Sequence, residues 1–155
     1  MNMKDVCKAF TDKLEGTITD SFYDDDDGGF VELDIENPAD IDMDIQIEID
    51  SSYFGFSYCS YDETYGYDAC DKSVIDDICK KIQAILDNKL CLIAIETNEK
   101  SVNLLKDISE VGNDRLAEII AVCSENAEKG IIKIILWNKI TEKQFTNTDS
   151  GYIFK

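Results

Sequence analysis

The chain contains no histidine, a single proline, and no lysine or arginine from Leu14 to Asp71. The absence of histidine excludes Ser-His and Cys-His nucleophile systems and most zinc sites. The sequence also has no CxxC pair and neither of the glycine-rich nucleotide-binding motifs GxxxxGK(S/T) and GxGxxG. We therefore predict a protein that is not an enzyme, with no catalytic residues, no metal site and no cofactor.

Long hydrophobic runs are missing as well. No run approaches the roughly 18 residues that a membrane-spanning helix needs, and Met1 to Glu15 lacks the apolar stretch of a signal peptide. The six cysteines are expected to be reduced thiols, because nothing marks export and a chain of 155 residues needs no disulfides to fold. These features predict a cytoplasmic protein.

Acidic residues dominate the composition, and their distribution is uneven. The net charge is −18, and residues 1–71 hold 20 acidic and 3 basic residues, against 13 and 12 in residues 72–155. Binding duplex nucleic acid or an anionic membrane requires clustered Lys and Arg. We therefore expect no direct binding of nucleic acid and no binding to a membrane.

Hydrophobic periodicity and turn residues predict an α+β fold. The predicted helices span residues 3–15, 72–88, 101–111 and 113–130. The predicted strands span residues 17–23, 30–36, 40–50, 53–61, 90–95, 131–137 and 151–154. We expect an N-terminal helix, an antiparallel β meander, then helix-strand-helix-strand, packed as one layer of helices on a mixed sheet. Residues 1–155 are expected to form a single domain, with an acidic β-rich half (1–71) and a neutral α/β half (72–155).

The clearest pattern lies in residues 40–50, where apolar and polar side chains alternate. The apolar positions are Ile41, Met43, Ile45, Ile47 and Ile49, and the polar positions are Asp40, Asp42, Asp44, Gln46, Glu48 and Asp50. The preceding strand repeats the pattern, with Glu32, Asp34 and Glu36 expected to point outward. Successive side chains point to opposite faces of a strand, so the sequence predicts one sheet face rich in carboxylates.

Such a face costs folding free energy, because Asp disfavours strands and like charges on adjacent strands repel. We interpret the face as a docking surface for a basic protein, since a positive partner would offset the repulsion and be steered toward it. The alternative interpretation is a solvated acidic face that has no partner.

Aromatic residues near these carboxylates favour the docking interpretation. Tyr53, Tyr61, Tyr65 and Tyr67 lie close in the sequence to Asp62 and Glu63. Apolar anchors inside a charged rim are typical of protein interfaces, so these six residues complete the predicted partner-binding set. The alternative is that the tyrosines mainly cover the core.

Two carboxylate-based functions remain open. Residues 24–35 resemble a calcium-binding loop in spacing, but Ile35 stands where the bidentate Glu belongs. Pairs of carboxylates also perform glycoside hydrolysis when one is held neutral by burial. A calcium-binding module or a carboxylate-based hydrolase is therefore a candidate of another class.

In size, charge and missing catalytic groups, the chain resembles the small acidic immunity proteins of bacterial toxin systems. The acidic strands at residues 32–36 and 40–50 carry this resemblance. It implies a one-to-one inhibitor that covers the basic active-site cleft of a toxin, often a nuclease. The same chemistry would suit a nucleic-acid-mimicking inhibitor of a DNA-binding or defence protein.

Overall fold

The computed structural model describes residues 1–69 and 71–155, without the side chains of Asp27 and Ala69. It divides the chain into two compact units, Met1–Gln83 and Ala84–Lys155. The division falls inside helix α2 (Lys72–Leu86), later than the change in composition after Asp71. The expected single domain stays a prediction.

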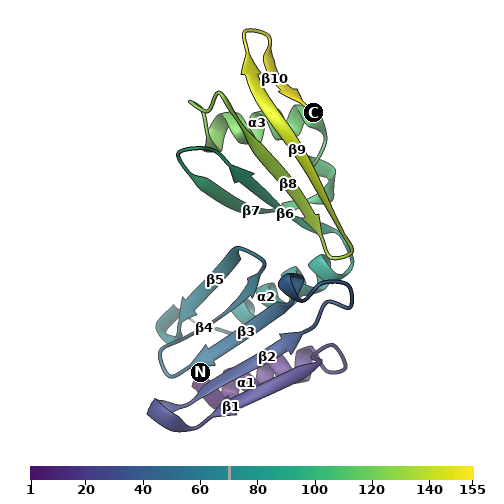
Figure 1. Ribbon diagram of the computed structural model, residues 1–155. Helices are drawn as coiled ribbons and strands as arrows, with labels where there is room; N and C mark the ends of the chain where they lie inside the picture. The colour runs from purple at the N-terminus through teal and green to yellow at the C-terminus, as the bar shows by residue number, and fades with distance from the viewer. Residues whose placement is uncertain (70) are drawn as a thin grey trace. The chain divides into compact units, whose positions relative to one another are not determined.

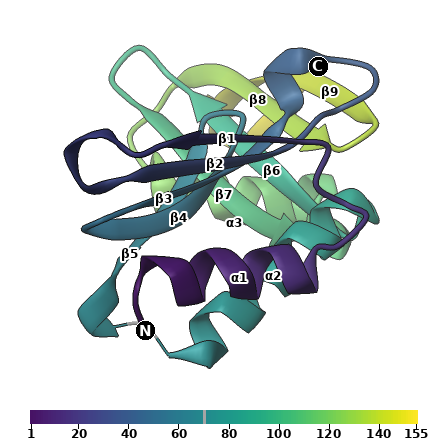
Figure 2. The ribbon, with the colours of Figure 1, turned by 90° about the horizontal axis from the view of Figure 1, so that it is seen from below.

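The N-terminal unit is a five-stranded antiparallel meander with helices on one face (Figures 1 and 2). Its strands are β1 (Asp20–Asp24), β2 (Phe30–Ile35), β3 (Ile45–Asp50), β4 (Tyr53–Tyr58) and β5 (Tyr61–Gly66). They lie side by side in sequence order, which confirms an antiparallel meander, but with five strands, because the strand predicted at residues 53–61 ends at Tyr58 and β5 follows. Figure 2 shows helices α1 (Met3–Lys13) and α2 together on the same side of this sheet.

Helix α1 begins at a reciprocal cap that the sequence supplies. The backbone N–H of Asp5 donates to Asn2 Oδ1 at 3.0 Å, and the backbone N–H of Asn2 donates to Asp5 Oδ2 at 3.2 Å. This capping box satisfies two N–H groups that the first helical turn leaves unpaired. Val6 and Phe10, four residues apart, are fully buried on the face toward the sheet.

The hydrophobic core of this unit lies between the sheet and the two helices. The strands contribute the buried residues Val31, Leu33, Ile35, Ile45, Ile47, Ile49, Phe54, Phe56 and Tyr58. Helices α1 and α2, together with Leu14 directly after α1, contribute the buried residues Val6, Phe10, Leu14, Ile75, Ile78 and Ile82. Burial of each Ile, Leu or Phe side chain contributes roughly 1.5–3 kcal/mol to the stability of the folded state. The core therefore holds the alternating strands with their apolar side chains inward.

The C-terminal unit contains a second antiparallel sheet. Its strands are β6 (Leu90–Glu96), β7 (Ser101–Asp107), β8 (Lys129–Leu136), β9 (Lys139–Thr148) and β10 (Gly151–Phe154), in the spatial order β10-β9-β8-β6-β7. Helix α3 (Asn113–Cys123) packs Leu116 and Ile120 against one face of this sheet. The strand side of that core includes Ile93, Ile132 and Phe145.

The prediction of one mixed sheet is wrong, although the α+β class is confirmed. The described residues form two sheets, and the paired strands within each sheet are antiparallel. The error arose at residues 101–111, which were predicted to be helical but contain β7. Apolar residues occupy both faces of this segment, so its periodicity was ambiguous. Strand β7 reverses the chain before α3, and β8 therefore runs antiparallel to β6.

Two further findings concern membrane-spanning helices and thiols. No helix in the described ranges is long and apolar enough to cross a membrane. The cysteines at 7, 59, 79, 91 and 123 are free thiols, whereas Cys70 lies outside the described residues.

Gly55 is expected to be required where β4 meets β5. A Cβ atom at this position would lie 2.1 Å from the carbonyl oxygen of Glu63, a contact with backbone that no rotamer change relieves. We predict that Gly55→Ala lowers the free energy of unfolding by about 1–3 kcal/mol, measured by urea denaturation.

The matched control is Gly66→Ala, because a Cβ at Gly66 meets nothing within 4 Å. This variant should stay within about 0.5 kcal/mol of the unmodified chain. Equal stability of the two variants would show that the strands do not approach as described.

Candidate docking surface

The sheet of the N-terminal unit has an outer face that points away from α1 and α2. Cross-strand partners share a face, so the register places fifteen side chains or glycines there, and we call this set the acidic face. It comprises Asp20, Phe22, Asp24, Phe30, Glu32, Asp34, Gln46, Glu48, Asp50, Tyr53, Gly55, Ser57, Asp62, Thr64 and Gly66. Seven of its members are carboxylates, and none is a cation.

The carboxylates of the acidic face lack compensating charges. None of them forms an ion pair with any lysine or arginine in the described part of the chain. Glu32 stands directly opposite Glu48 across β2 and β3, and Asp20 stands opposite Asp34 across β1 and β2. Like charges in directly opposed positions destabilise a sheet.

The pKa values of two carboxyls record this environment. Partial burial, followed by repulsion from Asp34 and Glu48, raises the pKa of Glu32. Partial burial is also the largest cause of the raised pKa of Asp34; a hydrogen bond from Gln46 acts in the opposite direction, and repulsion from Asp20 and Asp44 adds to the rise. Both carboxyls therefore favour the protonated form more than they would in an unfolded chain.

Six of the predicted partner-binding residues lie together on the acidic face: Glu32, Asp34, Glu48, Asp50, Tyr53 and Asp62. Asp50 also serves the β3–β4 turn, because its Oδ1 accepts from the backbone N–H groups of Ser52 at 2.6 Å and Tyr53 at 2.8 Å. The predicted row of carboxylates therefore exists, but it is shorter along β3 than the sequence indicated.

The predicted strand at residues 40–50 is wrong in its first half. Residues Ile41–Met43 form a 3₁₀ turn, and Ile41 is 80% exposed although the alternation placed it inward. Asp40 Oδ1 accepts from the backbone N–H of Asp42 at 3.0 Å, and Asp44 Oδ1 accepts from that of Asn37 at 2.6 Å. Such local hydrogen bonds let Asp compete with strand pairing.

The four predicted residues Glu36, Asp40, Asp42 and Asp44 consequently lie in the connection between β2 and β3. They are not part of the acidic face.

The remaining predicted residues of β5 lie on the opposite, inner face. Tyr61, Glu63 and Tyr65 pair with the buried residues Tyr58, Phe56 and Phe54, so they point toward the helices. Tyr67 follows β5 and donates its hydroxyl to the backbone oxygen of Asp50 at 2.5 Å. These residues are separated from the acidic face by the sheet itself.

Glu63 is the centre of a polar network on this inner face. Lys81 Nζ lies 2.7 Å from both of its carboxylate oxygens, and the hydroxyls of Tyr61 and Tyr65 also donate to it. Burial raises the pKa of Glu63, but these hydrogen bonds and the charge of Lys81 outweigh it and lower the pKa overall. The network joins β5 to α2.

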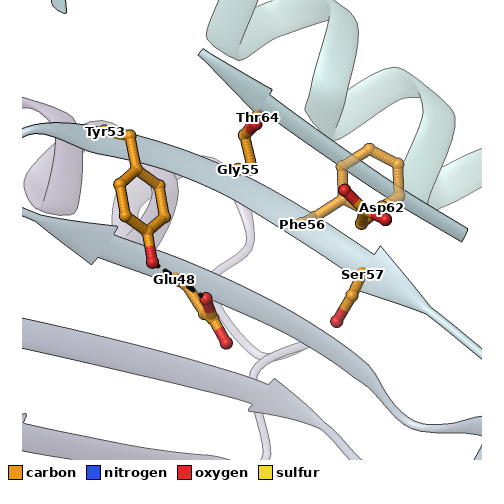
Figure 3. Close-up of a pocket in the computed structure, with 7 residues that line it drawn as sticks. All are labelled: Glu48, Tyr53, Gly55, Phe56, Ser57, Asp62 and Thr64. Carbon is orange, nitrogen blue, oxygen red and sulfur yellow. Dashed lines mark hydrogen bonds between the residues drawn. The ribbon is translucent and has the colours of Figure 1, made fainter. Parts of the chain in front are cut away.

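A shallow hollow lies on the acidic face above Gly55 (Figure 3). Its volume is about 350 Å³, and it is lined by Glu48, Tyr53, Gly55, Phe56, Ser57, Asp62 and Thr64. This hollow was not predicted from the sequence. The available signal was a glycine inside a strand of aromatic residues, which often marks a place where another group approaches the backbone.

The described residues were also compared with what a metal site requires. No group of three or more His, Cys, Asp or Glu side chains suited to a metal was found within residues 1–69 and 71–155. In the calcium-like loop, Asp24 Oδ1 accepts from the backbone N–H of Asp26 at 2.9 Å. Burial raises the pKa values of Cys59, Cys79 and Cys91 to about 11, so these thiols are protonated at neutral pH.

Comparison with known proteins found no relative. No protein-family model, no curated protein and no solved structure matches the chain. The geometry of the acidic face therefore carries the functional argument.

We predict that Glu32→Gln stabilises the protein at pH 7 by about 0.2–1 kcal/mol, because it removes one member of an opposed pair of like charges. Since the folded pKa of Glu32 is raised, its unfavourable contribution grows as pH rises from its ordinary pKa through the folded one. The gain should vanish near pH 3, where both states are protonated, and should shrink in high salt. Thermal melts at both pH values measure this. If Glu32→Gln stabilised the protein equally at pH 7 and near pH 3, the gain could not come from removing a charge.

We predict the opposite sign for Glu63. Glu63→Gln should lower the free energy of unfolding at pH 7 by about 1–3 kcal/mol, because Lys81 loses its charged partner. Because the folded pKa of Glu63 is lowered, this stabilisation is present above its ordinary pKa and is lost as pH falls through the folded value.

The control for Glu63 is Glu118→Gln, which breaks an exposed 2.9 Å ion pair with Arg115. That change should cost at most about 0.5 kcal/mol. Urea denaturation compares the two variants, and similar losses would mean that the Glu63 network has no special role.

Proposed function

We propose that the acidic face binds a basic protein, and that the chain acts as an immunity protein that neutralises a cognate basic toxin. The observation that carries this proposal is the set of seven carboxylates on one sheet face with no cation among them. The sheet holds two directly opposed like-charge pairs. A positive partner would convert this repulsion into attraction and would be steered toward the face.

The raised pKa values of Glu32 and Asp34 support the same proposal. Nearby positive charge favours the ionised form of a carboxyl and lowers its pKa. Binding of a basic partner would therefore release protons from these carboxyls in weakly acidic buffer. A solvated face without a partner would show no proton release of this kind.

Aromatic side chains give the acidic face an apolar component. Phe22 is 55% exposed, and Phe30 and Tyr53 are partly exposed on the same face. Interfaces combine such anchors with a charged rim. In the proposed role, the carboxylates meet Lys and Arg of a toxin active-site cleft, where a nuclease would otherwise hold substrate phosphates.

The proposed role requires no catalysis by this chain, and it is exercised in the cytoplasm. The partner is expected to be a basic toxin domain encoded beside the chain in its genome. A partner encoded in a phage operon would instead favour the nucleic-acid-mimicking inhibitor.

The test compares two triple variants that remove the same charge. One carries Glu32→Gln, Asp34→Asn and Glu48→Gln on the acidic face. The other carries Glu99→Gln, Glu125→Gln and Glu128→Gln, three exposed residues of the C-terminal unit. Affinity for the basic product of the adjacent gene is measured by titration calorimetry at graded salt.

The acidic-face variant should bind at least about a hundred-fold more weakly, with a smaller salt dependence, because close charge pairs across interfaces are worth about 1.5 kcal/mol or more each. The C-terminal variant should bind within about five-fold of the unmodified chain. If both variants bind the partner equally weakly, the loss is due to net charge and not to the acidic face. If both variants keep the affinity of the unmodified chain, the proposal is wrong.

A further inference from the structure

The hollow above Gly55 has a floor, a wall and a polar rim. Its floor includes the buried backbone at Gly55, against which the backbone of β5 packs closely. Figure 3 shows the ring of Tyr53 standing at one end, with Asp62 and Ser57 toward the other. A volume of about 350 Å³ lies at the lower end of the range for ligand sites.

The polar groups around the hollow are acceptors that are available to a ligand. Tyr53 donates weakly to Glu48 Oε2 at 3.5 Å, which places the ring beside that carboxylate. The side chains of Asp62, Ser57 and Thr64 form no hydrogen bond or ion pair with the described residues. Two carboxylates, two hydroxyls and an aromatic ring therefore converge on one small volume.

The chemistry of this lining selects a cation. An apolar or anionic occupant would bury Glu48 and Asp62 without a partner, which is strongly unfavourable. A cation placed against the face of Tyr53 gains attraction from the ring quadrupole, and it also gains charge-assisted hydrogen bonds to the carboxylates. Charge complementarity thus identifies the kind of group that fits.

We propose that the hollow receives one arginine side chain of the basic partner, with its guanidinium against Tyr53 and its N–H groups directed at Glu48 and Asp62. This inference rests on the proposed function and adds the partner's contact residue. Arginine is favoured over lysine because its planar guanidinium stacks on aromatic rings and carries five donors in a fixed fork. The lysine ammonium is a compact, strongly hydrated charge that loses more on leaving water.

The experiment uses the full chain labelled with ¹⁵N and two small probes of equal charge. Nα-acetyl-arginine methylamide and Nα-acetyl-lysine methylamide are titrated separately, and backbone amide shifts are followed by NMR. Saturable shifts should centre on Gly55, Ser57 and Thr64, and the arginine probe should bind at least about three-fold more tightly. Unsaturable shifts spread over the whole acidic face, equal for both probes, would overturn the proposal.

Variants identify the groups responsible. Asp62→Asn should weaken the arginine probe about three-fold. Asp20→Asn, which removes an equal charge from β1 at the far edge of the same face, should leave the affinity unchanged. Tyr53→Phe should retain binding and Tyr53→Leu should lose about three-fold, because only the former keeps the aromatic ring. Equal losses for Asp62→Asn and Asp20→Asn would mean diffuse attraction and no specific site.

This test is separable from the test of the docking surface. If the probes fail to bind the hollow while the triple variant of the acidic face still loses the partner, the arginine site is wrong and the docking surface stands. If the arginine probe binds the hollow while the triple variant binds the partner as tightly as the unmodified chain does, the docking surface is wrong. The hollow then remains a guanidinium site.

Discussion

The alternation of isoleucine with acidic or amide residues along β3 is the constraint on which the acidic face depends. Ile45, Ile47 and Ile49 are completely buried beneath the sheet, and the intervening residues must then point outward. The same rule applied to β2 places Glu32 opposite Glu48. Burial of the core thus brings the carboxylates together, and the favourable packing free energy opposes their repulsion.

The two faces of the N-terminal sheet differ in how their acidic residues are compensated. On the inner face, Glu63 is partly buried and is paired with Lys81 and two tyrosines. On the outer face, Glu32 and Asp34 have raised pKa values and no cationic partner among the described residues. The inner carboxylate is therefore compensated by a cation, whereas the carboxylates on the face that is proposed to bind a partner are not.

The alternation along a full strand could be predicted from the sequence. Hydrogen bonds from Asp side chains to nearby backbone groups, which compete with strand pairing, could not. The pattern in residues 45–50 correctly predicted that the polar side chains share the outer face, where they are half-buried. The same pattern at Ile41 failed, because Asp40 and Asp44 hydrogen-bond to nearby backbone N–H groups and close a turn. The hairpin of β6 and β7 was missed because residues 101–107 carry apolar side chains on both faces, which left their periodicity ambiguous. The face on which Glu63 lies depends on the register of β4 with β5, which spacing alone does not determine.

The central claim is that the carboxylates of the acidic face repel one another without compensation. The most direct test is a ¹³C NMR titration that measures the side-chain pKa values of Glu32 and Asp34 at low and high salt. Both pKa values should exceed those of unstructured peptides at low salt and should fall when salt screens the neighbouring charges. Ordinary or depressed values at low salt would mean that positive charge already neutralises this face, and the proposed need for a basic partner would be gone.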